Sequence, residues 1–296
     1  MNRKISEQEE HYKCLLCGSN ELKLLKRYQC AYLVKCKICG FVFSRRIPEQ
    51  QELVRHYEAY GRNDYLSPVT IKRYNELLDF FEIYRKTNNL LDIGCGIGYF
   101  LEQAIKRGWN TYGTEFTDHA ADICSDKGIK MHKGELDPQN YQSGSFDVIT
   151  SFEVLEHINN PIDEINSIKR ILKNGGLFYF TTPNFSSFSR LILKDKWNVI
   201  AYPEHLSYYT PKTAVYLLKN NGFNKLKILT TGFSLTRIQK SLNISDQPNI
   251  SACSDDERLR IRFEKYKFLK ILKLLFNSFL TLANKGDTLK AYFIKN

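Results

Sequence analysis

An apolar run that ends in an acidic residue is followed by three alternating glycines at residues 89–100, NLLDIGCGIGYF. The acid is Asp92, and the glycines are Gly94, Gly96 and Gly98. Glycine adopts positive φ without strain and lets a ligand approach the backbone closely. A helix that starts just after such a turn offers unpaired N–H groups and a partial positive charge. The pattern therefore indicates a nucleotide-like ligand at a strand–turn–helix, although a glycine-rich turn also occurs for structural reasons alone.

Four of the eight cysteines form two close pairs, and each pair is followed by glycine. The pairs are CLLCG, with Cys14 and Cys17, and CKICG, with Cys36 and Cys39. Two such pairs supply four thiolates for one tetrahedral ion, which suits Zn²⁺. A site closed by four sulfurs leaves no open position for chemistry, so we expect a structural zinc. Bound iron and a redox pair are the alternatives.

From residue 89 onward, apolar strand-like runs alternate with helical periodicity, which predicts an α/β fold with a parallel sheet covered on both faces. The predicted strands are 89–93, 110–115, 129–132, 146–151, 177–182, 226–230 and 288–294. The predicted helices between them are 98–107, 117–127, 161–172 and 210–220, and Asn174-Gly175-Gly176 is expected to end the third of these.

These elements suggest three parts. Residues 11–46 form a zinc-ribbon-like module whose stability depends on the metal. Residues 47–88 form a helical linker or lid, in which Tyr57, Tyr60 and Tyr65 either pack in the linker or line an acceptor pocket. Residues 89–296 form the α/β domain, with a helical insertion at about 241–285.

The formal net charge of +11 is concentrated at the ends of the chain. Lys and Arg outnumber Asp and Glu by 11 to 7 in residues 1–60 and by 10 to 5 in residues 255–296. Such flanks attract RNA, a nucleotide-linked substrate or a membrane surface, or simply aid solubility. The basic amphipathic stretch 259–283 fits peripheral membrane contact; packing over the active site or a dimer interface is the favoured alternative. The polar start of the chain and the absence of a long apolar run predict a cytoplasmic protein.

Several blocks resemble class I S-adenosylmethionine (SAM)-dependent methyltransferases at the right separations. Besides residues 90–100, they are 113–115 (GTE), 145–149 (SFDVI), 152–158 (FEVLEHI) and 172–176 (LKNGG). Residues 203–211 (PEHLSYYTP) resemble a subgroup that includes methyltransferases acting on sugars and small metabolites. Some sugar C-methyltransferases also carry an N-terminal four-Cys zinc module, which matches the order of parts here.

The resemblance implies a Rossmann-like, seven-stranded, mostly parallel sheet and a SAM site. Glu115 lies 21 residues beyond Gly94, close to the distance at which an acid binds ribose hydroxyls; a surface glutamate is the alternative. Asp92 is expected to orient the turn or the cofactor ammonium, and Glu135 and Leu136 to lie near the adenine. The expected cofactor-binding residues are Asp92, Gly94, Cys95, Gly96, Gly98, Glu115, Phe116, Glu135, Leu136 and Phe152.

Methyl transfer to oxygen or nitrogen needs alignment of the reactants and removal of a proton from the acceptor. Histidine is the usual base because its pKa is near neutrality. His205 and His157 are the candidate catalytic residues, with Glu204 as an orienting partner. Packing or capping is the alternative for His157, and a structural role in its loop is the alternative for His205.

The sequence thus predicts a SAM-dependent methyltransferase that acts on a small-molecule, sugar or glycan-precursor acceptor. An RNA methyltransferase is the second hypothesis, in which the zinc ribbon and basic flanks grip phosphate. A non-enzymatic SAM- or zinc-binding protein is the third.

Overall fold

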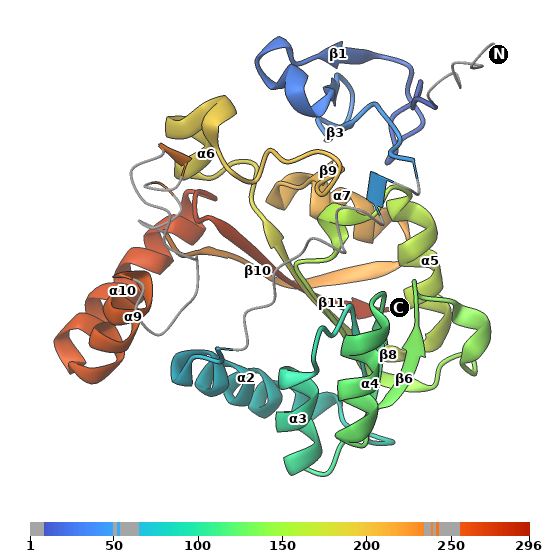
Figure 1. Ribbon diagram of the computed structural model, residues 1–296, viewed down its shortest axis with the longest axis vertical. Helices are drawn as coiled ribbons and strands as arrows, with labels where there is room; N and C mark the ends of the chain where they lie inside the picture. Colours follow the sequence, from blue (N-terminus) through green and yellow to red (C-terminus); the bar gives the residue numbers. More distant parts are fainter. Residues whose placement is uncertain (1–8, 50–51, 54–64, 234–237, 239–240, 243–254) are drawn as a thin grey trace.

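The computed structural model describes residues 9–49, 52–53, 65–233, 238, 241–242 and 255–296. Tyr57 and Tyr60, which the sequence places in a lid, lie outside the described residues. A seven-stranded sheet forms the centre of the molecule, and a four-stranded sheet lies at one end (Figure 1).

The large sheet has the strand order β10-β11-β8-β7-β4-β5-β6. Its strands are β4 (Asn89–Ile93), β5 (Asn110–Glu115), β6 (Lys130–Lys133), β7 (Phe146–Phe152), β8 (Leu172–Pro183), β10 (Phe223–Thr231) and β11 (Thr288–Lys295). Six of the seven strands run in the same direction, and β11 runs antiparallel to them. The predicted mostly parallel, seven-stranded α/β fold is therefore confirmed.

Helices cover both faces of this sheet because its central strands carry apolar side chains on both faces, as the continuous burial of β7 and β8 shows. On one face, α2 (Pro68–Phe81), α3 (Tyr99–Lys106) and α4 (Asp118–Asp126) pack on β4, β7, β8 and β11. On the other, α5 (Pro161–Ile171) and α7 (Pro211–Asn220) pack on the opposite side chains of the same strands. Ser67 and Thr210 cap the N-termini of α2 and α7 with their hydroxyls.

Three local expectations differ from the structure. β8 begins at Leu172, directly after α5, so Gly175 and Gly176 lie within the strand, where the pairing of β7 and β8 shifts register. The amphipathic stretch 259–283 belongs to two helices, α9 (Asp255–Lys265) and α10 (Lys267–Leu282), because Tyr266 has extended backbone angles. A short helix, α6 (Phe188–Leu193), was not predicted.

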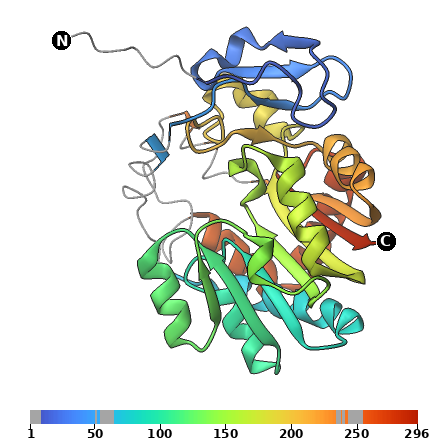
Figure 2. The same ribbon diagram turned by 90° about the vertical axis from the view of Figure 1, so that its right-hand side faces the viewer.

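The small sheet contains three strands from the cysteine-rich segment and one from the α/β domain. Its order is β1 (Leu22–Leu24), β2 (Leu33–Cys36), β3 (Val42–Ser44) and β9 (Ser207–Tyr208), all antiparallel. Phe41, beside β3, packs against Tyr209, with ring centroids 5.2 Å apart. The cysteine-rich segment therefore shares a sheet and a core with the α/β domain (Figure 2); the division at residue 46 stays a prediction.

The pair α9–α10 lies at the outer edge of the molecule, beside β10 (Figure 1). α10 turns Leu280 toward β10 but leaves many apolar side chains exposed, with Phe268 74 % and Leu282 85 % accessible. No helix among the described residues has both the length and the apolar character needed to cross a bilayer. Membrane contact and dimerisation through this segment stay predictions.

Candidate active site

The candidate site lies at the carboxyl ends of β4 and β7, where the strand order reverses direction. The chain runs outward from β4 to β5 and β6, then returns to β7 beside β4 and continues to β8. In open α/β sheets this reversal leaves a crevice at the carboxyl ends of the strands, and ligands bind there. The glycine-rich turn follows β4 directly.

All three glycines of the turn have positive φ, but they differ in the space available for a side chain. A Cβ on Gly94 (φ +66°) would come within 2.6 Å of Val154 Cγ2, and one on Gly98 (φ +77°) within 2.8 Å of Cys124 Sγ. Gly96 (φ +55°) has no atom within 4 Å of the position of a Cβ. Gly94 and Gly98 thus let the turn pack against the protein, while the space that a Cβ on Gly96 would occupy is open.

Glu115 is tied to the glycine-rich turn and to the loop after β5. Its Oε2 accepts a hydrogen bond from the Gly96 N–H at 3.0 Å, and its Oε1 accepts one from the Thr117 N–H at 3.1 Å. Oε1 also accepts a hydrogen bond from Thr117 Oγ1 at 3.3 Å, so the remaining lone pair of Oε2 can accept a further hydrogen bond. The acid and the turn predicted to act together are therefore in contact, with acceptor capacity left for a hydroxyl-bearing ligand.

Asp92 is buried at the end of β4, 2 % exposed, and accepts a hydrogen bond from Thr150 Oγ1 at 2.7 Å. Burial raises the pKa of Asp92 to about 7; the hydrogen bond from Thr150 opposes this shift and the nearby charge of Glu115 adds to it. The carboxyl group therefore changes its charge near neutral pH and responds to a cation placed beside it.

The other residues expected to contact the cofactor have varied surroundings. Phe116 and Glu135 are exposed, whereas Leu136 is buried in the core. Phe152 packs edge-on against Phe100 at a centroid distance of 5.0 Å. The Sγ atom of Cys95 lies 3.9 Å from that of Cys124. Their roles in binding stay predictions.

The two candidate histidines meet face to edge, although they come from different loops. The ring centroids of His157 and His205 are 4.9 Å apart. The Nδ1 atom of His205 lies 2.7 Å from the Val199 carbonyl oxygen, which accepts a hydrogen bond from the protonated nitrogen. This bond leaves Nε2 as the proton-accepting atom, 3.8 Å from Glu204 Oε1.

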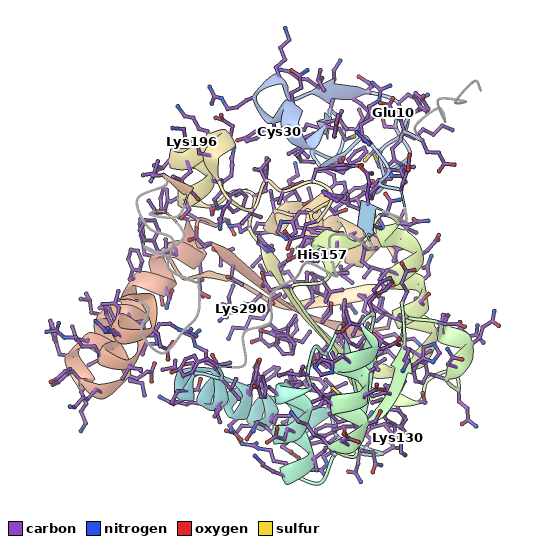
Figure 3. The ribbon with its side chains drawn as sticks, viewed as in Figure 1. Glu10, Cys30, Lys130, His157, Lys196 and Lys290 are labelled. Atoms are coloured by element: carbon purple, nitrogen blue, oxygen red, sulfur yellow. The ribbon has the colours of Figure 1, made fainter. Side chains whose placement is uncertain are left out.

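His157 is held neutral by its surroundings. Burial and the neighbouring His205 lower the pKa of His157 to about 4, although Glu204 opposes the shift. Its labelled side chain lies at the centre of the molecule, near the end of the large sheet (Figure 3). His205 has a hydrogen bond, from Nδ1 to the Val199 carbonyl, that can orient it as a base.

Glu156 is a candidate site residue that the sequence did not single out. Its side chain is 2 % exposed, and Oε2 has no hydrogen-bond partner among the described residues. Burial raises its pKa well above the ordinary value. One ligand atom from each of Glu156, His157 and His205 fits within 4.8 Å, a spacing that could hold a metal ion. The acid that directly precedes His157 was the available sequence signal.

The four predicted zinc ligands lie together. Their sulfurs are all within 4.8 Å of one another, with the Cys14–Cys39 pair 3.4 Å apart and the Cys17–Cys36 pair 3.5 Å apart. Two sulfurs on one tetrahedral zinc are about 3.8 Å apart. Gly18 has φ +69°, and its N–H donates to the Cys14 carbonyl at 2.9 Å, which closes the first turn. This cluster could hold a metal.

Comparison with known proteins shows what the chain is similar to. A family profile described as "Methyltransferase domain" matches residues 65–228, more than half of the chain. Curated relatives include ubiquinone biosynthesis O-methyltransferases. The one from Actinobacillus pleuropneumoniae is 31 % identical over 118 residues, which cover 34 % of this chain and 50 % of the relative. The one from Coxiella burnetii is 22 % identical over 206 residues, covering 65 % and 85 %. The chain thus spans about half the length of relatives such as the Actinobacillus enzyme.

Solved structures share the fold. A SAM-dependent methyltransferase from Archaeoglobus fulgidus superposes with a TM-score of 0.53 at 17 % identity, covering 83 % of this chain and 100 % of the other. Phosphoethanolamine N-methyltransferase 2 from Haemonchus contortus, in complex with S-adenosyl-L-methionine, superposes with a TM-score of 0.55 at 17 % identity, covering 86 % and 61 %.

Proposed function

The chain belongs to the methyltransferase-domain family that matches residues 65–228, and on this premise we propose that it transfers a methyl group from SAM to a small-molecule acceptor. One observation carries the proposal: the Glu115 carboxylate is hydrogen-bonded to Gly96, the glycine of the turn whose Cβ position is open. A ligand can therefore come close to the backbone here and donate its hydroxyl groups to a carboxylate. Both features lie at the position where an open α/β sheet binds its ligand.

The residues present fit SAM by the chemistry of their donor and acceptor groups. The open space beside Gly96 has room for a ligand close to the backbone, and Glu115 can accept a hydrogen bond from a ribose hydroxyl. Asp92 supplies a buried carboxyl group that could pair with the ammonium group of SAM. When bound, SAM supplies an activated methyl group. The chain itself must hold the acceptor in line and remove its proton.

His205 is the proposed base. Its Nδ1–H donates to Val199, so Nε2 can accept a proton from a hydroxyl or amine, and Glu204 lies close enough to stabilise the charged ring. We propose a sugar or glycan precursor as the narrower acceptor class, supported by the resemblance of residues 203–211. The related ubiquinone biosynthesis O-methyltransferases support a small-molecule acceptor, but one of a different chemical kind.

We further propose that Cys14, Cys17, Cys36 and Cys39 bind one structural Zn²⁺. Support comes from their sulfur separations and from the burial of three of the four. Elemental analysis of the purified protein tests this proposal: about one zinc per chain is expected, and none in a variant with all four cysteines changed to serine.

Calorimetric titration with SAM tests the cofactor site. Glu115→Ala should weaken SAM binding by roughly 10- to 100-fold, because hydrogen bonds to a charged group contribute about 1.5–3 kcal/mol. Asp126→Ala, which removes an exposed acid on α4, is the matched control and should bind normally. Unchanged affinity in Glu115→Ala would remove the ribose assignment.

Profiling of cell-extract metabolites with isotopically labelled SAM tests the reaction. Labelled small molecules should appear with the wild-type protein and decrease at least tenfold with His205→Ala. Normal turnover in His205→Ala would mean that another group is the base. Salt-sensitive binding of bulk RNA with labelled RNA as product would favour an RNA methyltransferase, and SAM binding without any labelled product would favour a non-enzymatic role.

A further inference from the structure

Lys290 places a positive charge at the carboxyl edge of the large sheet, beside the candidate site. It lies on β11 directly opposite Thr181 of β8, which in turn lies opposite Phe152 at the end of β7. Residues that are directly opposite in a sheet project from the same face. Lys290 therefore shares a face with Phe152, and Figure 3 shows its side chain between α10, α2 and the sheet.

Arg73 comes to the same place from α2. It directly precedes Tyr74, whose ring contacts Phe152 at a centroid distance of 5.9 Å and Phe100 at 5.3 Å. Tyr74 therefore holds this part of α2 over the ends of β7 and α3. Arg73, at the preceding position of the helix, is half-buried.

Arg260 is the third cation and comes from α9. Its Nη2 donates to Thr70 Oγ1 at 3.4 Å, and Thr70 precedes Arg73 by three residues, on the same side of α2. Three elements that are far apart in the sequence, α2, α9 and β11, thus bring one cation each to the carboxyl edge of the sheet.

The acids nearby balance these cations only in part. Arg260 pairs with the buried Glu257 at 3.3 Å, and Glu264 pairs with both Lys72 and Lys273. Arg73 and Lys290 form no ion pair with any residue that the structure describes. Glu153, at the end of β7, and the exposed Glu76 are the remaining carboxylates whose charges act on them.

The surroundings disfavour the charged form of both unpaired cations. Burial, then the positive charges of Arg73, Lys273 and Arg260, lowers the pKa of Lys290 to about 8, and Glu153 opposes the shift. Burial and Arg260 lower the pKa of Arg73, against the opposing charges of Glu264, Glu76 and Tyr179. Half-buried like charges of this kind destabilise a fold unless a counter-ion joins them.

We propose that Lys290, Arg73 and Arg260 bind an anionic group, a phosphate or a carboxylate, on the methyl acceptor. Arginine pairs with both groups in a two-pronged geometry, and lysine adds a point charge. The proposal rests on the proposed function, because the cluster stands at the end of β7 and β8, beyond the turn assigned to SAM. It narrows the acceptor to molecules that carry an acid.

Calorimetric titration of inorganic phosphate, pyrophosphate and acetate into the full-length protein tests the site, with S-adenosylhomocysteine present at saturation. At least one probe should bind the wild type, and Lys290→Gln and Arg73→Gln should each weaken that binding tenfold or more. Lys225→Gln removes the same charge from an exposed position on β10 and should bind as the wild type does. Tighter binding of pyrophosphate than of acetate would identify a phosphate-bearing acceptor, and the reverse a carboxylate.

Two further readings separate this proposal from the proposed function. Affinity for S-adenosylhomocysteine and the melting temperature should not fall in Lys290→Gln or Arg73→Gln. Equal binding of all probes by wild type, Lys290→Gln and Arg73→Gln, or no binding by the wild type, would overturn the anion site while leaving the SAM site standing. Failure to bind S-adenosylhomocysteine, with probe binding intact, would overturn the methyltransferase proposal, and the anion site would stand without its assignment to a methyl acceptor.

Discussion

At the scale of single residues, Asp92 and Lys290 both have pKa values moved toward neutrality by burial, in opposite directions. Such shifts mean that the folded protein disfavours the charged form until a partner of opposite charge arrives. For Asp92 we propose that the partner is the ammonium of SAM, and for Lys290 an acid on the acceptor. Both shifts can be measured through their pH dependence.

The first prediction concerns Asp92. Below pH 7 its carboxyl group is protonated and neutral, so binding a cation there must release a proton. SAM affinity should therefore fall about tenfold for each pH unit below about 7 and level off above it. Without ligand, the raised pKa means that the folded state holds this proton more tightly than the unfolded state, so stability falls as pH rises from about 4 to 7.

Calorimetry of SAM binding between pH 5.5 and 8.5 checks this linkage. Asp92→Asn should bind more weakly above pH 7 and lose most of the pH dependence. The same slope in Asp92→Asn as in wild type would show that another group releases the proton.

The second prediction is that Lys290→Met stabilises the ligand-free protein. At pH 7 the substitution removes an uncompensated, half-buried cation, which should raise stability by about 1 kcal/mol and the melting temperature by about 2–4 °C. The native pKa of about 8 lies below the ordinary 10.5, so the unfolded state binds more protons between these values. The unfolding free energy of the wild type should therefore increase relative to that of the variant as pH rises from about 8 to 10.5.

Thermal denaturation of wild type, Lys290→Met and Lys225→Met at pH 7 and pH 9.5 checks this prediction. Lys225 is exposed, and its substitution should change stability by less than about 0.5 kcal/mol at either pH. A lower melting temperature for Lys290→Met at pH 7 would mean that its charge is already compensated in the folded protein.

Contacts between candidate site residues can be predicted from the sequence where both partners belong to neighbouring strands joined by one turn and one helix. The glycine-rich turn and Glu115 belong to adjacent strands joined by a single helix, so their spacing predicts their contact. Lys290 could not be found in this way, because its neighbours depend on β11 inserting between β8 and β10. Glu156 was missed because its burial follows from the docking of the loop around His205.

At the scale of elements, α10 shows what periodicity leaves open. The spacing of its apolar residues predicts an amphipathic helix, which the structure contains, but not which side faces the protein. In the folded chain, Leu280 is fully buried and its carbonyl oxygen accepts a hydrogen bond from Thr230 Oγ1 at 2.8 Å. Much of the apolar surface of the helix faces outward instead.

The third prediction compares two leucines on this helix. Leu280→Ala should destabilise the protein by about 2–5 kcal/mol, because it removes a fully buried side chain and leaves a cavity. Leu275→Ala should change stability by less than about 0.5 kcal/mol, because that side chain is 64 % exposed. Urea denaturation measures both. A large loss in Leu275→Ala would mean that its side chain is covered in solution, as in a dimer.

At the scale of the whole molecule, the cysteine-rich segment and the candidate base are parts of one structure. β3 of that segment pairs with β9, with Phe43 opposite Ser207, and β9 begins two residues after His205. The Ser44 N–H also donates to the Leu206 carbonyl at 2.8 Å. Sequence reasoning predicted the cysteine site but not this connection, since a two-residue strand has no periodicity to recognise.

The last prediction follows from this connection: removing the proposed zinc should loosen the loop that carries His205 and leave the proposed SAM site in place. The strands β1–β3 are short, and the four cysteines lie in and beside the turns that precede β1 and that join β2 to β3, so the proposed ion should hold these turns together. Without it, β9 loses its partner strand, and the backbone amides of residues 205–209 should exchange with deuterium at least tenfold faster. Residues 89–115 depend on the large sheet, and their exchange should be unchanged.

Hydrogen–deuterium exchange of wild type, of chelator-treated protein and of the Cys14→Ser/Cys39→Ser variant measures both regions. SAM affinity should persist while turnover falls. Equal protection of residues 205–209 in all three samples would show that the loop is held by the α/β domain alone.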